Sequence, residues 1–323
     1  MAKRRMTKKR KRALATFVVV AVLIIAALAA GVVMKGLGII DSVTDIFSMF
    51  SQSGEGLGGN TPVVEGSLNV HLIDVGQADS ILLMTSGANM LIDTGDLDDD
   101  YTDKIIDYLK KQGVSRLDYL VLTHPDADHI GGAPEIINEF EVVRCIMPDH
   151  AKTTDIYENT ISALEDNNVE VIEGKSGESF EFGDTLCNVL APIDIDGSES
   201  ANNASVVIKL THGENTFLFT GDAEEESEEK MLEKYSASDL EADFLKAGHH
   251  GSETSSTEAF LDAVRPKYAF ISCGEGNKYG HPDSVTLDKF AEREIEYYRS
   301  DINGTLIVIS DGTTLTLTPE KIG

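Results

Sequence analysis

From residue 67 onward, short apolar runs alternate with polar, glycine-bearing turns. Short apolar runs between turn residues are typical of strands, and apolar positions three or four apart are typical of helices. We expect strands at 68–75, 80–84, 89–92, 117–123, 142–147, 169–172, 186–190, 205–210, 216–220, 243–246, 268–272, 305–309 and 314–318, and near Ile295. We expect helices from about Ala133 and at 99–112, 223–235, 257–264 and 284–293. This order indicates an α/β (α+β) fold in which two mixed sheets carry helices on their outer faces.

The first part of the chain has a different pattern. Residues 13–34 carry no charge and form a mainly apolar run long enough to cross a bilayer as a helix. The basic segment 1–12 is expected to stay in the cytoplasm, which places everything after Lys35 on the outer side of the cell membrane. The alternative is a signal peptide, cleaved near the small residues 27–29, that would leave a secreted protein. We prefer a single-pass, uncleaved anchor because the apolar run continues through 32–34.

A connecting region follows the expected anchor. Residues 51–66 are rich in Gly, Ser and other polar residues, which indicates a flexible linker. The apolar spacing in 39–50 fits either an amphipathic helix on the membrane surface or an extension of the anchor. The chain thus divides into a basic cytoplasmic segment (1–12), a transmembrane anchor (13–34), a juxtamembrane segment with a linker (35–66) and one globular domain (67–323).

Charge is distributed unevenly along the chain. Of the 27 Lys and Arg residues, nine lie in the first 35 positions, and no Asp or Glu precedes Asp41, so 18 bases face 55 acids in the remainder. Such a surface repels nucleic acid at long range, so a polyanionic substrate would need a metal ion and local cations to bind. A saline or extracellular environment would explain the acidic surface equally well.

Residues 124–129 read His-Pro-Asp-Ala-Asp-His and directly follow an expected strand. A strand that ends in a tight polar turn places neighbouring side chains at one edge of a sheet, where they can converge on a cation. Imidazole suits Zn, Mn or Fe, and carboxylates add charge and favour harder ions. The alternative is a polar loop that carries two unrelated histidines. We favour the metal site because other segments repeat the pattern.

Three further expected strands end in Asp or His beside glycine. They lead to Asp93, to Asp222 and to the pair His249 and His250. Each segment is weak evidence alone, because Asp-Thr-Gly and Thr-Gly-Asp are common in turns and helix caps. Together with 124–129 they supply the carboxylates and imidazoles that a two-metal hydrolytic centre requires.

These motifs resemble the metallo-β-lactamase superfamily, whose signature is His-x-His-x-Asp-His followed by a distant Asp and a further His. More narrowly, the chain is similar to the metallohydrolase domain of ComEC-type competence proteins over about residues 68–318. That similarity rests on residues 71–80, 124–132, 202–205, 220–222, 245–252 and 272–282. The resemblance implies an αββα sandwich with a metal centre at one edge of the two sheets.

The resemblance also implies a set of ligands for two divalent metal ions, either Mn or Zn. His124 and Asp126 would hold one ion. Asp128 and His129 would hold the other. Asp222 would bridge both.

Further roles follow from the same resemblance. His250 is expected to be a ligand and His249 to act beside the ligands or on the transition state, although the reverse assignment stays open. Asp128 and His249 are the expected catalytic groups. Asp93 is expected to orient the metal site through hydrogen bonds.

Two positions depart from the superfamily pattern. Position 126 is Asp where the wider superfamily has His. His212 is the one candidate for the middle His ligand, but it lies in an expected hairpin turn that faces solvent, and Asn203 stands where the competence-type proteins also lack that His. Both changes replace nitrogen with oxygen and favour Mn or another harder ion. They also argue against β-lactam hydrolysis and leave the number of metals open.

Three other polar residues need an interpretation. Lys246 and His281 are expected to lie beside the site or its substrate, and a structural turn is the alternative for His281. His71, on the first expected strand, is interpreted as a packed core residue.

The leading functional hypothesis is a membrane-tethered, metal-dependent hydrolase that acts outside the cytoplasm on a phosphodiester. The competence-type relatives imply a nuclease acting during DNA uptake, but with one expected span the chain is not expected to perform uptake alone. The alternatives are a phosphodiesterase on cell-wall polymers and a binding scaffold without catalysis. Calcium binding by the acidic run 224–229 is less favoured, because a solvated helix face explains that run. The sequence does not identify a protein partner.

Overall fold

The computed structural model describes residues 60–194 and 200–322. The basic segment 1–12, the expected anchor 13–34 and residues 35–59 of the juxtamembrane and linker region lie outside these residues. Within the part described, no helix combines the length and apolarity needed to cross a membrane.

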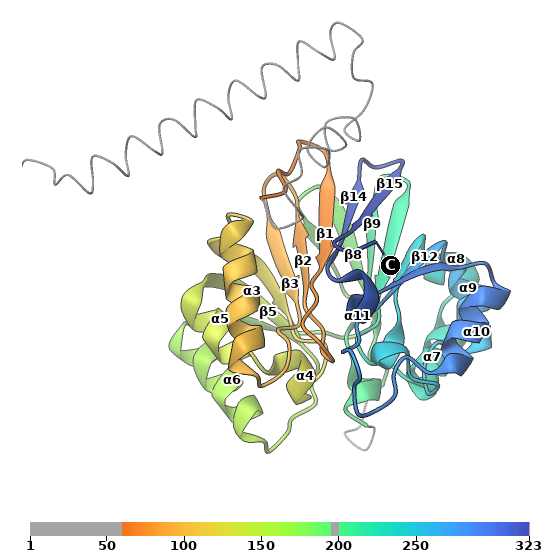
Figure 1. Ribbon diagram of the computed structural model, residues 1–323. Helices are drawn as coiled ribbons and strands as arrows, with labels where there is room; N and C mark the ends of the chain where they lie inside the picture. Colours follow the sequence, from red (N-terminus) through yellow and green to blue (C-terminus); the bar gives the residue numbers. More distant parts are fainter. Residues whose placement is uncertain (1–59, 195–199, 323) are drawn as a thin grey trace, which may run out of the picture. The chain divides into compact units, whose positions relative to one another are not determined.

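Two sheets stack face to face, with helices on both outer sides (Figure 1). Within the described residues, one sheet has the order β15-β14-β1-β2-β3-β4-β5-β6 and the other has the order β13-β12-β11-β10-β9-β8-β7. The first contains β1 (Leu68–Leu72), β2 (Ile81–Met84), β3 (Asn89–Ile92), β4 (Arg116–Val121), β5 (Glu141–Met147), β6 (Glu170–Glu173), β14 (Leu306–Ser310) and β15 (Leu315–Pro319). The second contains β7 (Ser179–Phe182), β8 (Thr185–Ala191), β9 (Val207–His212), β10 (Asn215–Phe219), β11 (Phe244–Lys246), β12 (Tyr268–Ile271) and β13 (Glu296–Arg299). The expected arrangement of two mixed sheets is therefore confirmed.

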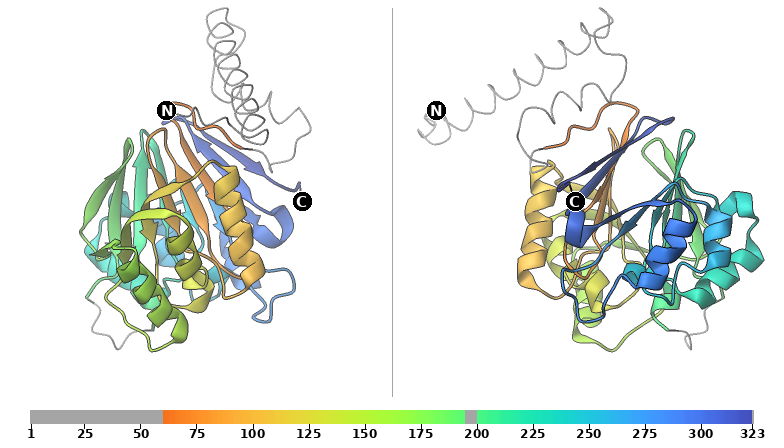
Figure 2. Two further views of the ribbon diagram at one scale, coloured as in Figure 1. Left: turned by 90° about the vertical axis from the view of Figure 1, so that its left-hand side faces the viewer. Right: turned by 45° about the vertical axis from the view of Figure 1, so that its right-hand side comes forward.

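The helices form the two outer layers of the sandwich. Helices α3, α5 and α6 lie outside the first sheet, and α7, α8, α9 and α10 lie outside the second, as the views in Figure 2 also show. Their bounds are α3 (Asp99–Lys111), α5 (Ala133–Glu139), α6 (Asp155–Asp166), α7 (Glu225–Lys234), α8 (Ala237–Leu240), α9 (Glu258–Val264) and α10 (Ser284–Glu292). Short helical turns occur at α4 (Ala127–Ile130), η1 (Asn202–Ala204), η2 (Gly248–Gly251) and α11 (Ser300–Asn303).

Successive side chains of each strand point to opposite faces of its sheet, and the apolar ones pack into three buried clusters. On β10, Phe217 and Phe219 point into the core between the sheets, while Leu218 packs on the opposite face with residues of α7 and α9. A third cluster joins the outer face of the first sheet to α3, α5 and α6. Because successive side chains of a strand point to opposite faces, this packing fixes the register of each strand and hence the position of its last residue.

Several details differ from the sequence prediction, among them the short helices α8 and α11, which were not expected. Helix α6 was not expected, because its buried positions are only Thr160, Ala163 and Leu164 on an otherwise polar segment. Strand β7 was also missed, because it is a short edge strand. His212 does end a hairpin strand, but the expectation that it faces solvent is wrong: it is buried, and its Nδ1 lies 2.7 Å from the hydroxyl of Ser310.

His71 on β1 is a buried core residue, as expected, and its burial predicts a pH effect. Burial lowers the pKa of His71 to about 3, below the ordinary 6.5. Between these values the unfolded chain takes up a proton that the folded chain excludes, so stability falls as the pH falls. When the pH is lowered from 7 to 5, the free energy of unfolding should fall by about 2 kcal/mol less in His71→Phe than in the wild type. Urea unfolding at both pH values tests this, and equal losses would contradict it.

Candidate metal centre

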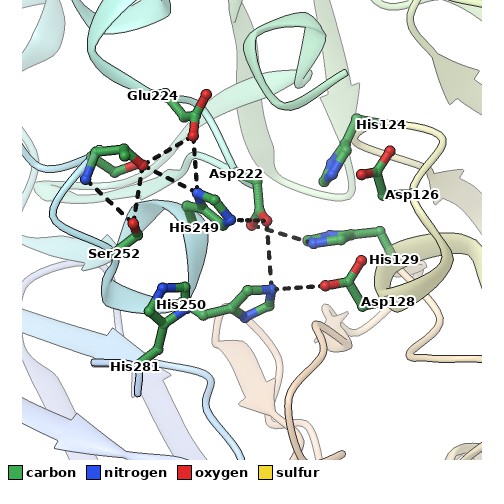
Figure 3. A network of polar contacts seen from close by, with 12 residues as sticks. His124, Asp126, Asp128, His129, Asp222, Glu224, His249, His250, Ser252 and His281 are labelled. Atoms are coloured by element: carbon green, nitrogen blue, oxygen red, sulfur yellow. Dashed lines mark hydrogen bonds and ion pairs between the residues drawn. The ribbon is translucent and has the colours of Figure 1, made fainter. Parts of the chain in front are cut away.

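Four strands direct polar side chains to the same edge of the sandwich. In the first sheet, Asp93 follows β3 and the 124–129 turn follows β4, and these two strands are parallel neighbours. In the second sheet, Asp222 follows β10 and the η2 turn follows β11, and these strands are also parallel neighbours. Parallel neighbours end at the same edge, so the four turns meet there. Figure 3 shows the side chains from both sheets facing one another.

Asp128, His129, Asp222 and His250 form the centre of this group. Each offers one ligand atom, and these atoms all lie within 4.8 Å of one another. Nε2 of His129 lies 3.3 Å from Oδ1 of Asp222, and Nε2 of His250 lies 3.4 Å from Oδ2 of Asp128 and 3.5 Å from Oδ2 of Asp222 (Figure 3). Two imidazoles and two carboxylates make a donor set that suits Zn or Mn.

The two histidines are held in the orientation that a metal ligand needs. Nδ1 of His129 lies 2.8 Å from a carboxylate oxygen of Asp93, and Nδ1 of His250 lies 2.9 Å from the carbonyl oxygen of Ser272. Because both partners are acceptors, each Nδ1 carries the proton and donates it. In the neutral ring that binds a metal ion, each Nε2 then keeps a lone pair directed at the centre.

Several buried polar atoms at the centre lack a hydrogen-bond partner among the described residues. They are Nε2 of His124, His129 and His250, and Oδ1 of Asp222. Leaving a buried polar atom without a partner costs free energy. A divalent cation coordinated by these atoms would remove that cost, so the residues fit a metal ion.

The electrostatics of the centre also fit a bound cation. Burial alone would raise the pKa of Asp222, but the neighbouring His250 and His129 outweigh it and hold the pKa well below its ordinary value. Burial alone would lower the pKa of His129, but Asp222 and Asp93 outweigh it and hold the pKa well above its ordinary value. Asp222 therefore remains ionised and attracts positive charge, from protons or from metal ions.

His124 and Asp126 lie beside this group but outside the four-residue cluster. His124 is buried, and its ring packs 4.1 Å from the ring of His129. Asp126 forms an ion pair with Lys152, and about a third of its side chain is exposed (31%). Sequence reasoning missed Lys152, which lies far from Asp126 along the chain. The ligand roles of His124 and Asp126 remain predictions.

Asn203 and His249 both form polar contacts with the segment that begins α7. The amide oxygen of Asn203 accepts hydrogen bonds from the backbone N–H groups of Glu224 and Ser227, at 3.1 and 3.2 Å. Asn203 therefore supports the start of α7. Nδ1 of His249 lies 3.1 Å from Oε1 of Glu224, its Nε2 lies 3.9 Å from Asp222, and a quarter of its side chain is exposed. This position beside the cluster agrees with a substrate-facing role for His249, which remains a prediction.

Lys246 is completely buried and pairs with Asp79, which sequence reasoning did not select. Nζ of Lys246 lies 2.7 Å from Oδ2 of Asp79. The backbone of Asp79 also donates to the carbonyl of Asp128 and accepts from Gly95. This pair therefore joins the two sheets directly behind the cluster, and it leaves Lys246 no access to a substrate. Its role is positional.

Asp93 holds the ring of His129, which predicts an effect on metal affinity. Asp93 is buried, and its carboxylate accepts a hydrogen bond from Thr123 as well as from His129. Asp93→Asn keeps the volume but removes the charge, so we expect metal affinity to fall about 10- to 100-fold. Calorimetric titration with Mn or Zn measures this. Asp118→Asn, at the other end of β4, is the control, and an unchanged affinity in Asp93→Asn would contradict the role.

The fold and this centre together define a metallo-β-lactamase-type protein, and the comparisons agree. The family model "Metallo-beta-lactamase superfamily" matches residues 73–275. Because that match covers more than half of the chain, the chain belongs to this superfamily.

Within it, the chain is similar to competence proteins. It is 32% identical over 261 residues to ComE operon protein 3 of Bacillus subtilis (strain 168), covering 76% of this chain and 33% of that protein. It is 34% identical over 246 residues to competence protein ComA of Neisseria gonorrhoeae, covering 76% of this chain and 32% of that protein. The chain thus spans about a third of the length of these relatives.

A solved structure shares the fold. A variant of the β-hydroxylase CmlA superposes with a TM-score of 0.50 at 13% identity, covering 76% of this chain and 54% of that one. At this identity the likeness concerns the fold alone.

Proposed function

We propose that this protein is a metal-dependent hydrolase that cleaves phosphodiester bonds, with nucleic acid as the preferred substrate class. The observation that carries the proposal is the convergence of Asp128, His129, Asp222 and His250 from both sheets within 4.8 Å of one another. Two bound divalent cations would lower the pKa of water and stabilise charge on the oxygens of a reacting phosphate.

The protein's own residues would bind and orient the substrate around that centre. His129 and His250 are locked by their Nδ1 hydrogen bonds, so the ligand atoms need no rearrangement. His249 is held by Glu224 and is partly exposed beside Asp222, where its Nε2 can donate a hydrogen bond to a phosphate oxygen or pass a proton to the leaving oxygen. Asp128, also partly exposed, lies on the open side of the centre and can position the attacking water.

The choice of phosphodiester rests on the similarity to competence proteins and on the chemistry of the donor set. Carboxylate-rich sites favour harder ions such as Mn, which bind phosphate oxygens well. A cell-wall polymer joined by phosphodiesters would use the same chemistry, and we keep it as the second candidate substrate.

Activity assays with defined substrates test the proposal. The purified protein, loaded with Mn or Zn, is assayed with bis(p-nitrophenyl) phosphate, single-stranded DNA and teichoic-acid fragments. We expect turnover on at least one, lost with EDTA and restored by added metal. No turnover on any of them, in a protein with metal demonstrably bound, would contradict the phosphodiesterase function.

We also propose that the protein is anchored in the cell membrane by residues 13–34, with its hydrolase domain on the outer side. The support is the uncharged run itself and the basic segment 1–12 before it. Protease added to intact cells should remove the domain and leave a short membrane-bound fragment. Recovery of the domain in the culture medium with a new N-terminus after residue 29 would instead indicate a cleaved signal peptide.

A further inference from the structure

The loop between β12 and α10 is held in one shape by a single side chain. The amide nitrogen of Asn277 donates to the carbonyls of Gly274 and His281, at 3.0 and 2.6 Å. Its amide oxygen accepts from the backbone N–H groups of Tyr279 and His281, at 3.2 and 3.1 Å. One residue thus joins both ends of the loop, so the side chains between them are presented in a fixed position.

This loop borders the metal centre on the side of His249. The ring of His281 lies 5.5 Å from the ring of His249 in an edge-on arrangement, and Figure 3 shows His281 beside the η2 turn. Gln77, in the loop that joins β1 and β2 of the first sheet, accepts a hydrogen bond from the backbone N–H of Gly274, and its amide nitrogen lies 3.5 Å from Nδ1 of His281. The loop is therefore fixed to both halves of the sandwich at the border of the site.

Tyr279 is displayed on this fixed loop. Its ring stacks on the ring of His281 with centroids 5.7 Å apart and an interplanar angle of 21°. Tyr279 is nonetheless 57% exposed, more than most large apolar or aromatic side chains of the domain. The aromatic row from His249 through His281 to Tyr279 leads from the metal centre outward.

A cation accompanies the exposed ring. Nζ of Lys278 lies 4.8 Å from the centre of the Tyr279 ring. Across the described residues Lys278 forms no ion pair with a carboxylate, although acids greatly outnumber bases in this chain. The ammonium group is therefore available to an anion from outside the protein.

We propose that Tyr279 and Lys278 form a subsite for one nucleotide of a single-stranded nucleic acid, which rests on the proposed phosphodiesterase function. The base would stack on the Tyr279 ring, and Lys278 would move off the ring to pair with the adjoining phosphate. Stacking on an aromatic platform tolerates any base and requires an unpaired strand. The subsite would thus favour single-stranded nucleic acid over polymers that lack bases.

The test compares a single-stranded oligodeoxynucleotide with an abasic strand of the same length, using the full-length protein with Mn. Tyr279→Ala should raise KM about tenfold for the base-bearing strand, leave kcat unchanged, and leave both constants unchanged for the abasic strand. Tyr279→Phe should behave as the wild type. Lys278→Gln should raise KM for both strands, because it removes a phosphate contact. Ile302→Ala, which truncates another exposed apolar side chain, is the control.

The same labelled strands, made with phosphorothioate linkages that resist cleavage, give a comparison that does not require cleavage when their binding to the Mn-loaded protein is followed by fluorescence anisotropy. The base-bearing strand should bind about tenfold more tightly than the abasic strand, and Tyr279→Ala should abolish that difference. Equal effects of Tyr279→Ala on both strands, equal binding of both strands by the wild type, or binding of neither would overturn the subsite. Cleavage without this preference would contradict the subsite but support the phosphodiesterase function. Base-dependent binding without cleavage would support the subsite but contradict the phosphodiesterase function.

Discussion

Asp222→Ala is expected to abolish metal binding at the centre and to reduce phosphodiesterase activity by at least about 1,000-fold. Asp222 lies 3.3 Å from Nε2 of His129 and 3.5 Å from Nε2 of His250, and it is buried between the two sheets. Metal ions contribute several kcal/mol to stabilising the transition state, and each 1.36 kcal/mol corresponds to a tenfold change in rate. Loss of this ligand should remove most of that contribution.

Metal content and thermal unfolding measure the loss without relying on the assay. In the wild type, EDTA should lower Tm, because a ligand that binds only the folded state stabilises it. In Asp222→Ala, EDTA should leave Tm unchanged. Asp243→Ala is the matched control, since Asp243 lies just before β11, at the end opposite the site, and pairs with Lys267. A full complement of metal in Asp222→Ala would contradict its role as a ligand.

The second large effect is expected on stability, from the pair formed by Asp79 and Lys246. Both side chains are essentially excluded from solvent, with 2% and 0% of their surface exposed, and their charged atoms lie 2.7 Å apart. Removing one partner leaves the other as an unpaired buried charge. We therefore expect Asp79→Asn and Lys246→Met each to lower the free energy of unfolding by about 3–5 kcal/mol.

The double variant distinguishes a buried ion pair from simple packing. Asp79→Asn with Lys246→Met leaves no unpaired charge, so its loss of stability should be well below the sum of the two single losses. Urea unfolding of all four proteins measures the coupling. The pair Arg265 and Glu241 serves as the control, because both side chains are more than half exposed and such pairs contribute about 1 kcal/mol or less. Additive losses for Asp79 and Lys246 would show that the pair does not act as a unit.

The sequence predicted most of the strands and the four turns of the centre because both depend on local patterns. A strand that buries one or both faces appears in the sequence as an apolar run. A turn that carries Asp or His directly after such a run can be recognised without knowledge of the fold. The meeting of Asp222 and His250 with the 124–129 turn required the resemblance to a known family, since nothing local links these segments.

The sequence could not reveal contacts that depend on packing between distant segments. The pairing of Lys246 with Asp79, of Lys152 with Asp126, and the use of Asn203 to support α7 all join residues from different elements. Charged and amide residues look alike in sequence whether they face solvent or a buried partner. Lys246 was therefore selected as a residue near the site or its substrate, although its actual contact is with Asp79.

Anomalous diffraction from crystals of the protein loaded with zinc would test the metal centre most directly. The centre described here predicts a peak bonded to Asp128, His129, Asp222 and His250, at ligand distances of about 2.0–2.2 Å. The absence of a peak at these four side chains, while they keep the arrangement seen here, would contradict it.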